Sequence, residues 1–95
     1  MGGVWVVKLI PNSRRQLQEL PDAVREACLD VIEDLREGEF PSDRTPLRGH
    51  RMFERLKFHR KAYRMIYRIN SRTRTIVITR IVKRDERTYK GFGPG

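Results

Sequence analysis

Hydrophobic positions follow two different periods along the chain, and each period predicts one kind of element. From Val24 to Leu35 the apolar residues recur at the three- and four-residue spacing of one helix face, with charged residues between them. Gly38 and Pro41 follow as a plausible C-cap and a residue that prevents continuation. This stripe predicts an amphipathic helix, and Cys28 within it is interpreted as a small buried hydrophobe.

A strand and a shorter helix are predicted before this stripe. Residues 4–10 are rich in β-branched side chains and are bounded by glycine and proline, which predicts a buried strand. Asn12 or Ser13 can cap the free N–H groups of a helix that runs to about Leu20. Pro21 ends that helix and suits the first turn of the next one.

The second half of the chain has the two-residue alternation of strands. It predicts strands at 52–58, 62–69 and 74–82, joined by short polar links. Residues 40–49, with prolines and polar side chains, are predicted to form a loop. The resulting order, β-α-α-β-β-β, predicts an α+β fold in which two N-terminal helices pack on one face of a small, mostly antiparallel sheet.

Length and composition limit the other classes of protein. Ninety-five residues predict one domain, 1–95, with a mobile tail at 90–95. No segment approaches the roughly 20 apolar residues of a membrane span, and no signal peptide is recognisable, so we expect a cytoplasmic protein without a membrane partner. One cysteine and two histidines exclude the usual zinc spacings, and we expect neither a structural metal nor a cofactor.

Charge is divided unevenly between the two halves. Residues 1–43 carry five Lys/Arg against nine Asp/Glu, a net charge of −4, whereas residues 44–95 carry 16 against three, a net charge of +13. The basic half is also the predicted strand half. A sheet with this much positive charge creates a focused field, for which a polyanion is the natural partner.

Strand parity predicts that several of these cations share one face. Arg55 and Lys57 are two residues apart and project from the same side of their strand, and Arg64 has the opposite parity from the apolar residues of its strand. If the helices cover the apolar side, these three cations lie on the uncovered side, where Lys83 and Arg84 can reach them. Cations beside an exposed ring suit single-stranded RNA, and the candidate rings are Phe53 and Tyr89.

Four segments in this half stand in a characteristic order. They are Pro46-Leu47-Arg48-Gly49, Arg55-Leu56-Lys57-Phe58, Ala62-Tyr63-Arg64-Met65-Ile66-Tyr67-Arg68 and Val82-Lys83-Arg84-Asp85-Glu86-Arg87-Thr88-Tyr89. As a set they resemble the RelE/ParE toxin superfamily, with a likeness that covers residues 4–89. The resemblance implies a type II toxin–antitoxin system: a small endoribonuclease that cleaves messenger RNA, in many members on the ribosome, and a cognate antitoxin that neutralises it.

The resemblance also implies roles for single residues. Lys57 matches a lysine that acts as base toward the ribose 2′-hydroxyl, while Arg64 and Arg84 match two arginines that stabilise the charged transition state. Tyr89 matches a tyrosine that orients the substrate base, and Arg55 stands where RelE has a second lysine. The further cations expected to contact RNA are Arg48, Arg68, Lys83 and Arg87.

The sequence departs from the RelE pattern in two places. Arg84 and Tyr89 are one residue closer together than their RelE counterparts, and Arg55 holds its charge too firmly to act as a base. Related members use a His or Glu pair, for which His59 and Glu54 are weakly placed. Arg64 and Arg84 are both expected to be exposed.

Two alternatives to the nuclease stay open. A ParE-type member would share the fold but target gyrase and lack the catalytic cations. A non-catalytic relative would bind nucleic acid without cleaving it. The nuclease itself is chemically reasonable without a metal, because attack of a 2′-hydroxyl on the adjacent phosphate needs only positioning, charge stabilisation and proton transfer.

Overall fold

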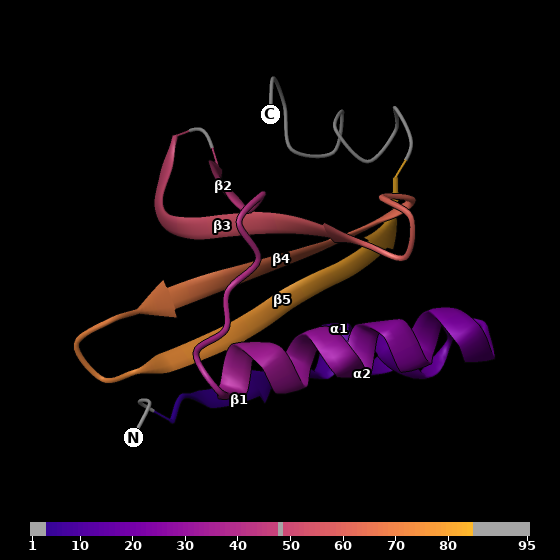
Figure 1. The fold of residues 1–95 in the computed structure, drawn as a ribbon, viewed down its shortest axis with the longest axis horizontal. Coiled ribbons are helices and arrows are strands. Elements are labelled where there is room, and N and C mark those ends of the chain that lie inside the picture. Colours follow the sequence, from indigo (N-terminus) through magenta and orange to yellow (C-terminus); the bar gives the residue numbers. More distant parts are fainter. Residues whose placement is uncertain (1–3, 48, 85–95) are drawn as a thin grey trace.

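Two helices lie on one side of a five-stranded sheet in the computed structural model, which describes residues 4–47 and 49–84 (Figure 1). The elements in chain order are β1 (Val6–Leu9), α1 (Pro11–Gln18), α2 (Asp22–Arg36), β2 (Thr45–Leu47), β3 (His50–Phe58), β4 (Tyr63–Asn70) and β5 (Thr75–Lys83). The strand order is β1-β5-β4-β3-β2, antiparallel except that β1 runs parallel to β5. The predicted α+β fold, with two helices on a mostly antiparallel sheet, is confirmed.

The core lies between the helix pair and the sheet, where the helical stripe meets the alternating strands. The stripe of α2 buries Val24, Cys28, Ile32 and Leu35, as its spacing predicts. They pack with the sheet residues Leu56, Phe58, Met65, Tyr67, Ile76, Ile78 and Ile81. Each large apolar side chain buried in this way contributes about 1.5–3 kcal/mol of transfer free energy, so this layer dominates the stability.

The end of α2 has the predicted glycine cap. Gly38 has a φ of 81°, a left-handed conformation that costs glycine little. Its N–H donates to the carbonyl of Leu35 at 3.1 Å, and the N–H of Glu39 donates to that of Asp34 at 2.8 Å. This pair of bonds is the Schellman arrangement, which satisfies the last carbonyls of the helix and turns the chain toward the sheet.

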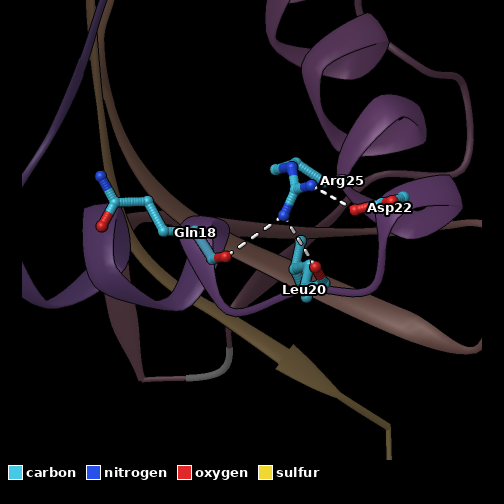
Figure 2. Close-up of polar contacts among 4 residues, drawn as sticks. All are labelled: Gln18, Leu20, Asp22 and Arg25. Atoms are coloured by element: carbon cyan, nitrogen blue, oxygen red, sulfur yellow. Dashed lines mark hydrogen bonds and ion pairs between the residues drawn. The ribbon is translucent and has the colours of Figure 1, made fainter.

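The turn between the helices is fastened by one arginine (Figure 2). Arg25 Nη1 donates to the carbonyl oxygens of Gln18, at 3.2 Å, and Leu20, at 2.9 Å, and Nη2 pairs with Asp22. These carbonyls lie at the C-terminal end of α1, where a cation also interacts favourably with the helix dipole. Arg25 therefore sets how α2 follows α1.

The prediction that a side chain caps α1 is wrong. Helix α1 begins at Pro11, whose missing N–H costs nothing there, and the cap residue is Ile10. Ser13 lies within the first turn and is completely buried, and its hydroxyl donates to the carbonyl of Ile78 at 2.6 Å. The same hydroxyl lies 3.1 Å from the carbonyl oxygen of Ile10, so it joins the start of the helix to β5.

The first strand is less buried than predicted. β1 is an edge strand, and its side chains alternate: Val6 is 49% exposed, whereas Val7 and Leu9 pack against the core. Because β1 lies at the edge of the sheet, it has one neighbouring strand, β5, and the core covers only one of its faces. The β-branched composition of residues 4–10 predicted the strand but not its position in the sheet.

The predicted loop at 40–49 contains a short strand. β2 pairs antiparallel with β3, with Thr45 opposite Arg55 and Pro46 opposite Glu54. The proline is tolerated because β2 forms the other edge of the sheet. The connection to it from α2 is held by Phe40, whose ring lies 5.2 Å from that of Trp5 in an edge-to-face arrangement.

The remaining strands lie close to their predicted ranges. β4 and β5 are each displaced by one residue, and β3 begins two residues earlier than expected. The predicted mobile tail at 90–95 lies outside the described residues. In the described part of the chain, neither helix is long and apolar enough to cross a membrane.

Candidate functional site

The side of the sheet away from the helices, called the open face below, gathers cations from four strands. The strand registers show that the side chains of these cations project from the side of the sheet opposite to the core residues. They are Lys8, Arg55, Lys57, Arg64, Arg68 and Arg80. Among the described strand residues, no open-face position carries a carboxylate, so the strands themselves contribute only positive charge to this face.

Two of the cations face each other directly. Lys57 on β3 is the cross-strand partner of Arg64 on β4, a position at which side chains lie about 4.5–5.5 Å apart at Cβ. Like charges at such a position destabilise a sheet by a few tenths to 1 kcal/mol. Such a pair suits an anion that binds between the two side chains.

Arg64 is buried, which corrects the expectation that it is exposed. It is 3% exposed and sits on β4, the middle strand, between Lys57 on one side and Val82 on the other. Sequence parity identified its face correctly but carried no information about its depth.

Arg55 is oriented by the strand that the sequence did not predict. Its Nε donates to the hydroxyl of Thr45 at 3.2 Å, across the β2–β3 pair. This bond fixes the direction of the guanidinium on the open face. Arg68 lies further along β4, opposite Phe53, and is exposed.

Arg84 is tied to the turn between β3 and β4. Its backbone N–H donates to the carbonyl of Ala62 at 2.7 Å, and Lys83 is paired with Tyr63 on β4. Both cations are exposed, as predicted for Arg84. The end of β5 therefore lies beside the end of the hairpin that carries Lys57 and Arg64.

The turn at this end has unusual backbone geometry. His59, Arg60 and Lys61 have φ values of 52°, 60° and 62°, three consecutive left-handed residues without a glycine. Each such residue costs roughly 1–2 kcal/mol relative to the right-handed region. The turn presents Arg60 and Lys61 to solvent just beyond the Lys57–Arg64 pair, and backbone strain of this kind concentrates at functional sites.

Glu54 and His59 are not brought together as a catalytic pair. Glu54 has the parity of the core, and its Oε1 accepts a hydrogen bond of 2.8 Å from the Tyr67 hydroxyl. The same oxygen pairs with Arg44 at 3.3 Å. Burial and the bond to Glu54 raise the pKa of Tyr67 above its usual value. Glu54 thus belongs to the covered side of the sheet, away from the open-face cations.

Arg80 is a site residue that sequence reasoning missed. Simple alternation from Ile76 and Ile78 would turn position 80 toward the helices. The β4–β5 register instead shifts by one residue at this point, so that Ile66 lies opposite Arg80 and Tyr67 lies opposite Ile78. Nothing in the sequence except the odd spacing of Ile78 and Ile81, both core residues, signals this β-bulge.

Three of the predicted contacts remain predictions because they fall on residues outside the described part of the chain. These are Arg48, Arg87 and Tyr89. Within the described part, no three His, Cys, Asp or Glu side chains gather in a way that could hold a metal ion.

Comparison with protein families and solved structures shows what the chain is similar to. The family model described as phage derived protein Gp49-like matches residues 15–91, which is most of the chain. None of the curated proteins matches it at a significant level.

Several solved structures of RelE proteins have the same fold. The RelBE2 toxin–antitoxin complex of Mycobacterium tuberculosis contains a chain with 25% identity and a TM-score of 0.63, covering 86% of this chain and all of that one. The RelE–RelB complex of Pyrococcus horikoshii gives 23% identity, a TM-score of 0.71 and coverage of 88% and 99%. The isolated RelE toxin of E. coli has 18% identity and a TM-score of 0.66, and the match covers 95% of this chain and 97% of that one. The resemblance to the RelE/ParE superfamily is therefore confirmed in the fold.

Proposed function

Because the chain belongs to the Gp49-like family of phage-derived proteins and has the RelE fold, we propose that it is the toxin of a type II toxin–antitoxin system and an endoribonuclease that cleaves messenger RNA. The observation that carries the proposal is the open face. Lys57 and Arg64 are direct cross-strand partners there, with Arg55 beside them and Arg84 at the same end of the sheet. A ParE-type gyrase toxin would have no use for this set.

RNA binding rests on the charge of this face. Arginine side chains bind phosphate oxygens through paired N–H groups, and lysine does so as a point charge. The buried guanidinium of Arg64 favours an anion more strongly than a solvated one would, because the local dielectric is low. The phosphate of the cleaved bond is assigned to the space between Lys57 and Arg64.

Cleavage follows as an internal transesterification. The ribose 2′-oxygen attacks the adjacent phosphorus as its proton passes to Nζ of Lys57, which must be the unprotonated amine for this step, and the bond from phosphorus to the 5′-oxygen breaks. The products are a 2′,3′-cyclic phosphate and a 5′-hydroxyl, whose oxygen takes up a proton. Arg64 and Arg84 stabilise the negative charge that develops on the phosphate oxygens, and Arg55 holds the phosphate. Tyr89 would orient the neighbouring base by stacking.

The proposed partners are messenger RNA, with the ribosome as the place of cleavage, and a cognate antitoxin. Two of the similar structures are complexes of RelE with RelB. The antitoxin of this chain would carry an acidic segment that folds over the open face and neutralises Lys57 and Arg64. Cytoplasmic localisation follows from these partners and is part of the proposal.

The test is cleavage of a defined RNA by the purified chain, with and without ribosomes, in the presence of a metal chelator. We expect products ending in a cyclic phosphate and a 5′-hydroxyl, and no cleavage where the scissile nucleotide has a 2′-deoxyribose. Arg72→Ala serves as the control variant and should cleave as the wild type does, since it removes one exposed cation from the turn at the opposite end of β4. Intact RNA with wild-type protein, combined with arrest of replication in cells, would favour the gyrase alternative. Binding without cleavage or arrest would favour the non-catalytic relative.

A further inference from the structure

The β-bulge in β5 decides which residues of that strand face the RNA. Val82 lies opposite Arg64 and Arg80 lies opposite Ile66, but the next pair along joins Ile78 to Tyr67, so Thr79 is the extra residue. The bulge lets Ile78 and Ile81 both enter the core while Arg80, between them, turns to the open face. Without it, a charged side chain would point at the helices.

Three polar contacts hold the bulge, and two of them come from α1 on the opposite side of the sheet. The hydroxyl of Thr79 donates to the carbonyl of Ile66 at 3.2 Å. The backbone N–H of Ile81 donates to Oε1 of Gln16 at 2.8 Å, and the carbonyl of Ile78 accepts from the buried hydroxyl of Ser13 at 2.6 Å. The pairing of β1 with β5 ends at Leu9 and Ile78, and the Ile78 carbonyl also accepts from the N–H of Ile10 at 3.4 Å. The backbone groups of β5 on both sides of the bulge thus have partners in the first helix.

Arg80 extends the cation cluster across the sheet. In the row that contains it, Thr45, Arg55, Ile66 and Arg80 follow one another over four strands. Arg80 is therefore about 10 Å, two strand spacings, from Arg55 and lies diagonal to Arg64, at about 7–8 Å. It stands between the proposed cleavage site and Lys8 on β1, which faces the same side.

We propose that Arg80 contacts a backbone phosphate of the RNA that flanks the cleaved bond, and that Gln16 positions Arg80 through the bulge from the covered side of the sheet. This inference rests on the proposed nuclease function and adds to it the path of the substrate: the RNA leaves the Lys57–Arg64 pair across β4 and β5 toward β1. Arg80 is a binding residue, and Gln16, which touches no substrate, is a positioning residue.

The first experiment measures the salt dependence of RNA binding. The probe is a short fluorescent 2′-O-methyl RNA, which the 2′-hydroxyl mechanism cannot cleave. Arg80→Ala should weaken binding several-fold near physiological salt and reduce the slope of log K against log salt by about 0.7, the value for one phosphate contact on a single strand. Arg72→Ala removes the same charge from an exposed turn and should leave the slope unchanged. Arg80→Lys should retain most of the slope.

The second experiment separates positioning from folding. Gln16→Ala should weaken RNA binding in the wild-type background and have no further effect when combined with Arg80→Ala, at a temperature where every variant is folded by circular dichroism. Gln18→Ala, on the exposed side of the same helix, is the control and should not change binding.

The outcomes distinguish this inference from the function on which it rests. If wild-type protein binds the probe with a steep salt slope but Arg80→Ala and Arg72→Ala behave alike, the role of Arg80 is overturned and the nuclease proposal stands. If Gln16→Ala weakens binding equally in both backgrounds, its positioning role is overturned. If the wild type does not bind RNA, both proposals fail together.

Discussion

The two sides of one sheet have opposite chemistry although they are built from the same strands. On β4, Met65 and Tyr67 are completely buried against the helices, while Arg64 and Arg68 point the other way. The covered side stabilises the fold by removing apolar area from water. The open side gathers like charges, which folding alone does not favour. Stability and the proposed chemistry are thereby assigned to alternate residues of the same segment.

Because of this alternation, the separation of core residues from cations depends on the register of the strands. Because the side-chain period of a strand is two, a register slip of one residue would exchange core and cations. The bulge at Thr79 uses such a slip locally and brings Arg80 to the open face. The comparison between the two sides can therefore be tested by substitutions that should affect only one of them.

Removing a side chain from the covered side should have the largest effect on stability. Leu56 is completely buried between the helices and the sheet, so Leu56→Ala leaves a cavity and should lower the free energy of unfolding by about 2–5 kcal/mol. Chemical denaturation measures the loss. The variant that remains folded should bind RNA with wild-type affinity, and a large loss of affinity at full folding would contradict the separation of the two sides.

Removing a charge from the open side should slow RNA cleavage and slightly raise the free energy of unfolding. Lys57→Met should slow RNA cleavage on the order of 10²-fold, by analogy with loss of one catalytic group. It should also raise the free energy of unfolding by about 0.2–1 kcal/mol, since Arg64 then faces no like charge. Single-turnover cleavage and denaturant titration on the same preparation provide both numbers. A variant that is both destabilised and active would refute the assignment.

Alkaline pH should destabilise the fold through two titrating groups on the covered side, Cys28 and Tyr67. Burial raises the pKa of Cys28 from 9.0 to about 12, so the folded state keeps a proton that the unfolded chain releases. The contribution of the protonated Cys28 thiol to the free energy of unfolding is complete below about pH 9. It is lost as the pH rises toward 12, by about 1.4 kcal/mol per pH unit. Tyr67, whose pKa is also raised, adds to the loss above about pH 10.

The control for this pH effect is Cys28→Ala, which removes the titrating thiol. Its free energy of unfolding should fall less steeply between pH 8 and 10.5 than that of the wild type, whatever the cost of the substitution at neutral pH. Equal slopes for the two proteins would show that the thiol does not carry the effect.

The smallest expected effect concerns the strained turn at the edge of the open side. Arg60 has a φ of 60°, so Arg60→Gly relieves left-handed strain, and we expect a net gain of about 0.5 kcal/mol after the greater freedom of glycine in the unfolded chain is counted. Arg72→Gly removes the same charge from the other hairpin turn and should destabilise slightly. Thermal unfolding of the pair distinguishes strain from charge, because a charge effect alone would move both variants in the same direction.

Periodicity was sufficient to predict most of the covered side. The spacing of Val24, Cys28 and Leu35 predicted α2 and its buried stripe, and the alternation of Leu56 and Phe58 predicted the inner side of β3. These are local patterns, and local patterns record which side of an element is apolar.

Features that depend on distant partners escaped prediction. Strand β2 contains a proline and only three residues, and it forms because β3 offers it an edge. Arg64 is buried, whereas the alternation of its strand predicts only which side of the sheet it faces. Ser13 looked like a helix cap and instead bonds to Ile78, 65 residues away. Arg80 reaches the open face only through a bulge that the first helix supports.

The parallel pairing of β1 with β5 has a consequence for synthesis of the chain. Val6 pairs with Thr75 and Leu9 with Ile78, so the first strand finds its neighbour only after a loop of nearly seventy residues is closed, a slow, high-contact-order step. Arg80 belongs to β5 and Arg84 follows it directly. A nascent chain that lacks β5 therefore has neither a closed sheet nor a complete cation cluster, and the proposed nuclease gains its activity only after the codons for β5 and Arg84 have been read.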